Sequence, residues 1–215
     1  MGKLIVFEGT DGSGKSTQFS LLTRRLEARG VDFRTMVFPQ YTEPSSALIR
    51  MYLGGEFGAR PSDVNAYTAS TFYAVDRFAA FRKVWGEYYR NGGLMLSDRY
   101  TTSNAVHQGG KLPPEAREDF FRWLYDFEFA RLGLPRPDLT LYLVVEPDVS
   151  MSLVDKRGEK KDIHETDAAY MRACYDAGLY AAAKLGFDRI DCCRDGRILP
   201  RETIADVIYG EVKRL

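Results

Sequence analysis

Short apolar runs alternate with stretches of helical periodicity along this 215-residue chain. Five runs have the length and apolar character of buried β-strands: residues 3–7, 32–38, 94–97, 139–145 and 187–191. Segments with helical spacing or helix start and stop signals lie between them: residues 17–29, 45–53, 61–89 and 114–131, and the segment that Pro200 opens. Strands that alternate with helices form parallel sheets covered on both faces, so the pattern predicts an α/β fold with ligands at the carboxyl ends of the strands.

Glycine and proline mark the ends of these predicted helices. Gly30 closes the first helix, and Pro44 begins the second. Pro61 begins a long aromatic-rich helix, which Asn91-Gly92-Gly93 ends and in which we expect a bend at Gly86.

The first apolar run leads into Gly9-Thr10-Asp11-Gly12-Ser13-Gly14-Lys15-Ser16, which has the spacing of a phosphate loop. Its glycines let successive backbone N–H groups point at phosphate oxygens, and the following helix brings the positive end of its dipole to the same place. Lys15 adds a positive charge, and Ser16 offers a hydroxyl to Mg²⁺. The alternative is a glycine turn with a surface lysine, which the strand and helix around the loop disfavour.

Asp98-Arg99-Tyr100 directly follows the apolar run that begins at Leu94. An acid at the end of a buried strand, in a chain with a phosphate loop, is suited to holding Mg²⁺ directly or through water. The planar fork of Arg99 is suited to gripping two phosphate oxygens. The alternative is an ion pair at the surface.

Two weaker patterns have both a functional and a bland interpretation. Tyr73 and Arg77 are four residues apart on a predicted helix and share a face, which suits stacking on a base but is also common at the edge of a core. Residues 156–161 hold four cations around Gly158, which suits a lid over a phosphate donor, although most such runs are simply solvated.

Composition narrows the class of protein. With 45% hydrophobic and 28% charged residues, the chain suits one globular domain, residues 1–215. The formal net charge of zero gives no reason to expect nucleic acid or a membrane as a partner. Cys174, Cys192 and Cys193 lack disulfide or metal-ligand spacing, and no targeting segment or long apolar run is evident, so we expect a cytoplasmic protein.

Four motifs and their order resemble the thymidylate kinase family over essentially the whole chain. They are residues 7–17, Phe38-Pro39, Tyr73 to Arg77, and residues 98–108, with a late helix at 170–183. The resemblance implies a P-loop kinase fold with a five-stranded parallel sheet, helices on both faces and a small lid at about residues 152–165. It also implies transfer of the γ-phosphoryl group of Mg-ATP to dTMP, giving dTDP and ADP, and a homodimer.

The resemblance further implies roles for individual residues. The ATP-binding residues would be Gly9, Thr10, Asp11, Gly12, Ser13, Gly14, Lys15, Ser16 and Thr17. The dTMP-binding residues would be Phe38, Pro39, Tyr73, Arg77, Arg99, Ser103, Asn104, His107 and Gln108, with Arg77 on the base or its phosphate. Mg²⁺ would be held by Ser16 and Asp98, and the catalytic residues would be Lys15, Arg99, Asp11 and Arg157. Adenine would lie near Arg194-Asp195.

The chain departs from the family's pattern at two places, and at a third it lacks an arginine that some members carry in the phosphate loop. Gln40-Tyr41 follows Phe38-Pro39 where the family often has an arginine, which leaves Arg50 as the replacement to consider. His107 stands where tyrosine or phenylalanine is common, so discrimination against ribonucleotides is less secure; alternatively, His107 is simply hydrogen-bonded at a helix edge. Residues 10–13 carry no cation, so we expect the lid to supply one, and Arg157 is favoured because its fork bridges two oxygens.

Two other functions remain open from the sequence. A deoxynucleoside kinase on the same fold would need a carboxylate base, for which Glu8 or Asp11 is available, but phosphate-gripping arginines argue against it. A P-loop regulatory switch would bind nucleotide and turn it over slowly.

Overall fold

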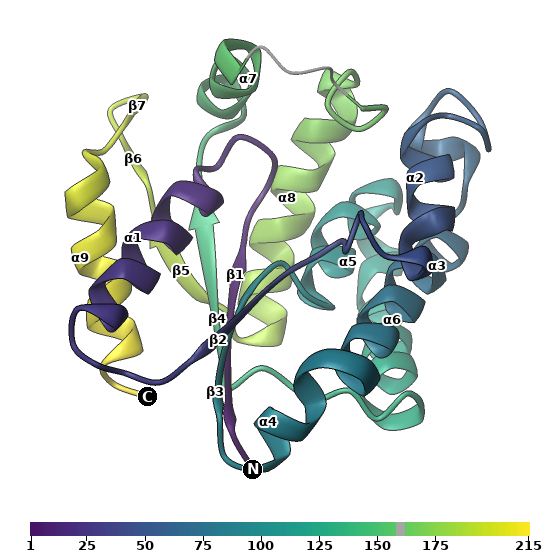
Figure 1. The fold of residues 1–215 in the computed structure, drawn as a ribbon. Coiled ribbons are helices and arrows are strands. Elements are labelled where there is room, and N and C mark those ends of the chain that lie inside the picture. The colour runs from purple at the N-terminus through teal and green to yellow at the C-terminus, as the bar shows by residue number, and fades with distance from the viewer. Residues whose placement is uncertain (158–161) are drawn as a thin grey trace.

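The computed structural model describes residues 1–157 and 162–215, with the backbone alone at Lys156 and Arg157. Its centre is a parallel five-stranded sheet with the strand order β2-β3-β1-β4-β5 (Figure 1). The strands are β1 Lys3–Glu8, β2 Arg34–Val37, β3 Leu94–Asp98, β4 Leu139–Val144 and β5 Asp188–Asp191. All five predicted strands are therefore present, and β2 is shorter than predicted.

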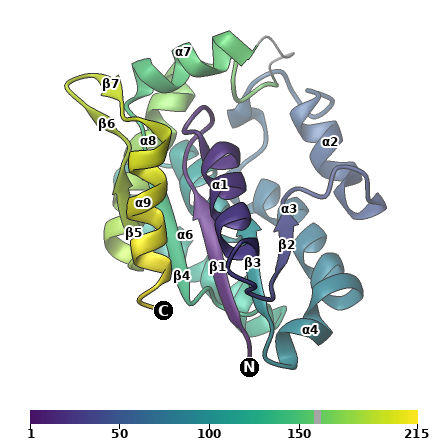
Figure 2. The same ribbon diagram turned by 60° about the vertical axis from the view of Figure 1, so that its left-hand side comes forward.

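Helices cover both faces of this sheet (Figures 1 and 2). One face carries α1 Lys15–Glu27 and α9 Arg201–Val212, which pack on each other. The other face carries α3 Ala66–Ala80, α4 Gly86–Arg90, α5 Thr102–His107, α6 Arg117–Tyr125 and α8 Ala168–Leu185. The remaining helices are α2 Ala47–Leu53 and α7 Pro147–Arg157, and α7 lies beyond the carboxyl ends of the strands.

The apolar run of β1 is continuous because both of its faces are buried. Leu4 and Val6 pack with the aromatic residues around α4, whereas Ile5 and Phe7 pack with α1 and α9. Side chains of a strand alternate between its two faces, so a central parallel strand with helices on both sides needs apolar residues throughout.

The helix predicted at residues 61–89 begins later in the structure than predicted. Pro61 begins a separate 3₁₀ turn, Pro61–Asp63, and α3 begins after Asn65, whose side chain accepts a hydrogen bond from Thr68 N at 2.8 Å. At the other end, the π-helical turn Phe81–Trp85 precedes Gly86. A Cβ at Gly86 would lie 2.3 Å from the carbonyl oxygen of Phe81, so this wide turn requires glycine.

Several short elements were not predicted. They are α5, α7 and the hairpin of β6 Cys193–Arg194 and β7 Arg197–Ile198. The predicted helix at 114–131 is α6, with a 3₁₀ turn Pro114–Ala116 before it and a π-helical turn Asp126–Arg131 after it. A further 3₁₀ turn, Gly109–Lys111, follows α5, and another, Pro44–Ser46, precedes α2.

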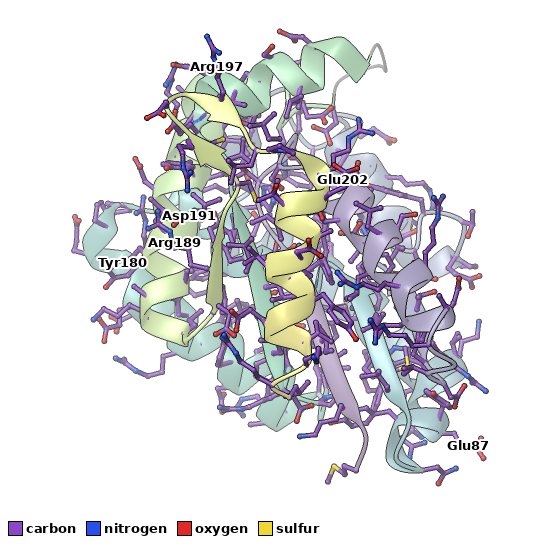
Figure 3. The ribbon with its side chains drawn as sticks, turned by 90° about the vertical axis from the view of Figure 1, so that its left-hand side faces the viewer. Glu87, Tyr180, Arg189, Asp191, Arg197 and Glu202 are labelled. Atoms are coloured by element: carbon purple, nitrogen blue, oxygen red, sulfur yellow. The ribbon has the colours of Figure 1, made fainter. Side chains whose placement is uncertain are left out.

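The edge strand β5 carries charged side chains. Arg189 and Asp191 project from the same side of the strand, and Arg189 Nε lies 2.7 Å from Asp191 Oδ1 (Figure 3). Charged side chains are a common protection of a sheet edge. Within the described residues, no helix has the length and apolar character needed to cross a membrane.

Candidate active site

The loop between β1 and α1 folds around the ammonium group of Lys15. Lys15 Nζ donates hydrogen bonds to the carbonyl oxygens of Gly9 and Thr10, at 2.9 and 2.8 Å. Burial, reinforced by the nearby charge of Arg99, lowers the pKa of Lys15 to about 8. The loop therefore holds its cation close to the backbone amides that the sequence predicts to bind phosphate.

Gly12 is required where this loop meets α7. Its φ of +75° favours glycine, and a Cβ at this position would lie 2.3 Å from the carbonyl oxygen of Ser150 in α7. Helix α7 thus rests directly on the phosphate loop.

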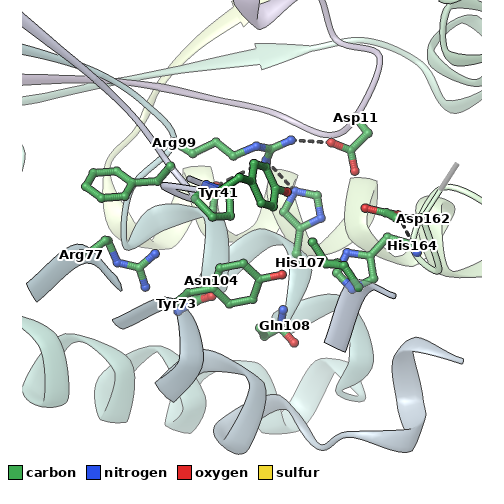
Figure 4. Close-up of a pocket in the computed structure, with 14 residues that line it drawn as sticks. Asp11, Tyr41, Tyr73, Arg77, Arg99, Asn104, His107, Gln108, Asp162 and His164 are labelled. Carbon is green, nitrogen blue, oxygen red and sulfur yellow. Dashed lines mark hydrogen bonds and ion pairs between the residues drawn. The ribbon is translucent and has the colours of Figure 1, made fainter. Parts of the chain in front are cut away.

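Arg99 directly follows β3 and connects the phosphate loop with α5. Its φ of +67° is uncommon for a residue with a side chain. Its guanidinium forms an ion pair with Asp11 of the loop, and Nη1 lies 2.9 Å from Nε2 of His107 (Figure 4). A guanidinium only donates hydrogen bonds, so Nε2 of His107 is the acceptor.

These contacts set the charges of Asp11 and His107. Burial works to raise the pKa of Asp11, but the charges of Arg99 and Lys15 hold it well below its usual range. Burial, helped by Arg99, holds the pKa of His107 well below its usual value. At neutral pH the carboxylate is charged and the imidazole is neutral.

Glu8 lies beneath Arg99 and is fully buried. Its carboxylate accepts hydrogen bonds from Gly9 N at 2.9 Å, Thr102 Oγ1 at 2.9 Å and Ser103 Oγ at 2.8 Å. These bonds tie the start of α5 to the phosphate loop. Burial raises the pKa of Glu8.

A pocket of about 490 Å³, its open mouth included, lies beside Arg99 at the carboxyl end of β3 (Figure 4). We call it the Arg99 pocket. Its lining includes Asp11 and all the residues that the sequence predicted to bind dTMP: Phe38, Pro39, Tyr73, Arg77, Arg99, Ser103, Asn104, His107 and Gln108.

Four lining residues had not been assigned a role: Tyr41, Leu53, Asp162 and His164. Tyr41 lies two residues after Pro39, and Asp162 and His164 lie in the predicted lid, so their proximity to these predicted features could have indicated a place in the site. Leu53 ends α2, and nothing in the sequence pointed to it. His164 is held by Tyr52, whose Oη lies 2.8 Å from His164 Nε2.

The inner end of the Arg99 pocket is polar. Arg77 is buried and forms a two-bonded ion pair with Glu128, which neutralises its charge. This pairing favours a role at the base over a role at a phosphate. Gln108 Oε1 is buried with no hydrogen-bond partner among the described residues, as is typical of a polar group that meets a ligand.

Ser16 and Asp98 fit a site for Mg²⁺. Asp98 ends β3 and is nearly buried, and its Oδ1 has no hydrogen-bond partner in the part of the chain that the structure describes. Ser16 is exposed at the start of α1. No cluster of three or more His, Cys, Asp or Glu side chains suited to a metal occurs among the described residues. This donor set suits Mg²⁺, which takes one or two carboxylates together with substrate phosphates and water.

The predicted lid at 152–165 is only partly described. Residues 152–157 belong to α7, residues 158–161 lie outside the described residues, and Asp162 and His164 line the Arg99 pocket. The side chain of Arg157 also lies outside the described residues. In the predicted adenine region, Arg194 ends β6 and Asp195 begins the turn of the β6–β7 hairpin.

Arg50, the residue considered in place of the absent arginine after Pro39, lies outside the lining of the Arg99 pocket. Its Nη1 donates to the carbonyl oxygen of Tyr41 and to Oγ of Ser46, both at 2.6 Å. It supports the loop that carries Tyr41 instead.

Comparison with known proteins assigns the chain to a family. The family model "Thymidylate kinase" matches residues 7–190, which include the phosphate loop and every lining residue of the Arg99 pocket. This chain belongs to the thymidylate kinase family. It is a dTMP kinase, which phosphorylates dTMP to dTDP, and a deoxynucleoside kinase or a regulatory switch is not favoured.

Relatives in the thymidylate kinase family cover most of the chain. A thymidylate kinase of Mycobacterium tuberculosis (strain CDC 1551 / Oshkosh) is 34% identical over 171 residues, covering 77% of this chain and 78% of that protein. A probable thymidylate kinase of Pyrobaculum aerophilum is 28% identical over 203 residues, covering 94% and 93%. A solved thymidylate kinase structure from Candida albicans has the same fold, with a TM-score of 0.72 at 19% identity, over 99% of this chain and 92% of that one.

Proposed function

We propose that this thymidylate kinase takes the γ-phosphoryl group from Mg-ATP bound at the phosphate loop and passes it to the 5′-phosphate of dTMP bound in the Arg99 pocket. The observation that carries the proposal is the ion pair between Arg99 and Asp11. It joins a loop built for phosphates to a pocket with a polar inner end, so a donor and an acceptor would meet at Arg99.

The residues then have distinct tasks. Lys15 and the loop amides bind the donor phosphates. Arg99 grips the acceptor phosphate and supplies fixed positive charge as charge shifts onto the bridging oxygens. Asp11 holds the guanidinium of Arg99 in place, and Phe38 and Tyr73 flank the base.

Mg²⁺ is the proposed cofactor, and the chain's own ligands for it are Asp98 and Ser16. When bound, the metal neutralises phosphate charge and orients the β- and γ-phosphates. The unpartnered Oδ1 of Asp98 supports this assignment. Positioning and fixed charge account for most of the rate acceleration in phosphoryl transfer, so the chain needs no covalent intermediate.

The direct test measures ADP release from Mg-ATP with dTMP, with thymidine or with neither. We expect rapid release with dTMP only. Equal or faster turnover with thymidine would show that the Arg99 pocket takes a nucleoside. Slow release that dTMP does not accelerate would indicate a nucleotide-binding switch.

We further propose a cytoplasmic homodimer with no nucleic-acid or membrane partner. The three cysteines are free thiols, which suits a reducing compartment, and the net charge is zero. One side of α3 exposes Tyr67, Val75 and Phe78, a row of apolar side chains suited to a second copy of the chain.

A further inference from the structure

A buried carboxylate behind the Arg99 pocket holds two of the pocket's polar walls. Glu128 lies in the π-helical turn after α6 and is fully buried. Its Oε2 accepts from Arg77 Nε at 2.7 Å, and its Oε1 accepts from Arg77 Nη2 at 2.5 Å and from Asn104 Nδ2 at 3.2 Å. Glu128 is not part of the pocket lining, so it acts on a ligand only through Arg77 and Asn104.

These contacts fix which way the Asn104 amide points. Its Nδ2 donates to Glu128 Oε1 and to the carbonyl oxygen of Ser70, at 3.2 and 3.3 Å. A carboxylate and a carbonyl only accept hydrogen bonds, so a flipped amide would place Oδ1 against two acceptors. Glu128 therefore keeps Nδ2 behind the wall and leaves Oδ1, an acceptor, for the ligand.

The same carboxylate fixes Arg77 as a donor. Glu128 takes Nε and one hydrogen of Nη2, while Nη1 has a long contact of 3.4 Å with the carbonyl oxygen of Tyr100. A guanidinium has no acceptor atom. The wall thus presents donors from Arg77 beside an acceptor from Asn104.

We propose that Glu128 is a positioning residue that selects pyrimidines with a C4 carbonyl next to N3–H over pyrimidines with a C4 amino group. Thymine and uracil offer an acceptor at O4 and a donor at N3, whereas cytosine offers a donor at N4 and an acceptor at N3. With cytosine, the N4 amino group would face the donors of Arg77, and N3, an acceptor, would face Oδ1 of Asn104. Buried sites built to form hydrogen bonds strongly disfavour ligands that leave such groups unpaired. The inference rests on the proposed position of the base between Tyr73, Arg77 and Asn104.

The test compares kcat/KM for dTMP, dUMP and dCMP in the parent and in Glu128→Gln. A glutamine side chain can present a donor as well as an acceptor to Asn104, so it no longer requires Nδ2 of Asn104 to face it. We expect the preference for dTMP over dCMP to fall by about tenfold or more. The preference for dTMP over dUMP should stay within about twofold, because both bases share the edge that Arg77 and Asn104 meet. An unchanged preference for dTMP over dCMP overturns the proposal.

Thr101→Val is the matched control. Its hydroxyl donates to Glu128 Oε2 at 2.7 Å but touches neither Arg77 nor Asn104 by a hydrogen bond. This variant removes one hydrogen bond from the same carboxylate but leaves its bonds to Arg77 and Asn104, so it should keep the parent preference. An equal loss of preference in both variants would show a general structural effect and overturns the proposal.

Two more variants separate the possible failures. Glu128→Asp keeps the charge that balances Arg77 but is too short to reach both partners, so it should lower the preference by about threefold or more even if the glutamine variant does not fold. A parent-like preference in Glu128→Asp overturns the inference. If Asn104→Ala leaves the KM for dTMP unchanged, the position of the base itself is wrong; if it raises that KM while the Glu128 variants keep the parent preference, only this inference is wrong.

Discussion

Lys15, which is buried, and Arg99, which is partly buried, are cations of the active site, but their surroundings shift their pKa values in opposite directions. Burial and the repulsion of Arg99 lower the pKa of Lys15 to about 8. Burial also works to lower the pKa of Arg99, but Asp11, Glu8 and Asp98 outweigh it and raise that pKa. At neutral pH the structure therefore supplies one permanent charge and one charge that pH can remove.

The lowered pKa predicts a pH dependence of ATP binding. Lys15 loses its proton as pH rises through about 8, and with it the attraction for the donor phosphates. We expect the Kd of ATP to rise roughly tenfold between about pH 7.5 and about pH 9. Isothermal titration in this range measures it. Lys15→Arg, which keeps its charge, should show a nearly flat profile, and a flat profile in the parent would contradict the assignment.

The two histidines of the chain predict an acid-sensitive stability. Burial lowers the pKa of His164 to about 3 and that of His107 well below its usual value. In the unfolded chain both histidines bind protons below about pH 6.5, whereas in the folded protein they stay neutral there. The unfolded state therefore binds more protons, and the free energy of unfolding decreases as the pH is lowered below about 6.5.

Each histidine should contribute about 1.4 kcal/mol of lost stability per pH unit below about pH 6. Urea unfolding between about pH 6.5 and pH 4.5 measures the slope. His164→Gln should make it shallower by about that amount. An unchanged slope in this variant would show that His164 is protonated in the folded protein.

At the scale of elements, α7 connects the phosphate loop to the lid. It packs on Gly12 through Ser150 and ends at Arg157, and Asp162 and His164 beyond it line the Arg99 pocket. A movement of α7 would therefore shift residues of both the phosphate loop and the Arg99 pocket. The lid is where we place the extra cation that residues 10–13 do not provide.

Arg157→Ala tests that placement. If the charge acts mainly in the transition state, kcat should fall by about 10² or more while ATP binding without turnover barely changes. Steady-state kinetics beside equilibrium ATP titration measure the two quantities, with Lys156→Ala as the neighbouring control. A kcat within about threefold of the parent would move the role to Lys156, Lys160 or Lys161, or remove it.

For the whole molecule, the exposed row on α3 predicts how two copies associate. Val75 is about half exposed in the middle of this row, so Val75→Glu should convert the proposed dimer to a monomer. Analytical ultracentrifugation of the parent and the variant measures the mass. Val207→Glu, at a comparably exposed site on α9, should remain dimeric. A monomeric parent, or a dimer in both variants, would place the contact elsewhere or abolish it.

Local sequence determined the strands and the phosphate loop, because buried strands and glycine loops depend on short-range patterns. The resemblance to the family's motifs predicted most of the residues that line the Arg99 pocket, but not Tyr41, Leu53, Asp162 or His164. The start of α3 was harder to predict, since the cap at Asn65 lies within the helical periodicity that begins at Pro61, whereas the bend expected at Gly86 coincides with the π-helical turn that precedes it. Only the tertiary structure showed that Glu128 neutralises Arg77, that His164 reaches the pocket from beyond α7, and that Arg50 donates to the loop that carries Tyr41. These pairings join residues up to 112 positions apart, as for Tyr52 and His164, and they arise because parallel strands and their connecting helices bring distant segments to one edge of the sheet.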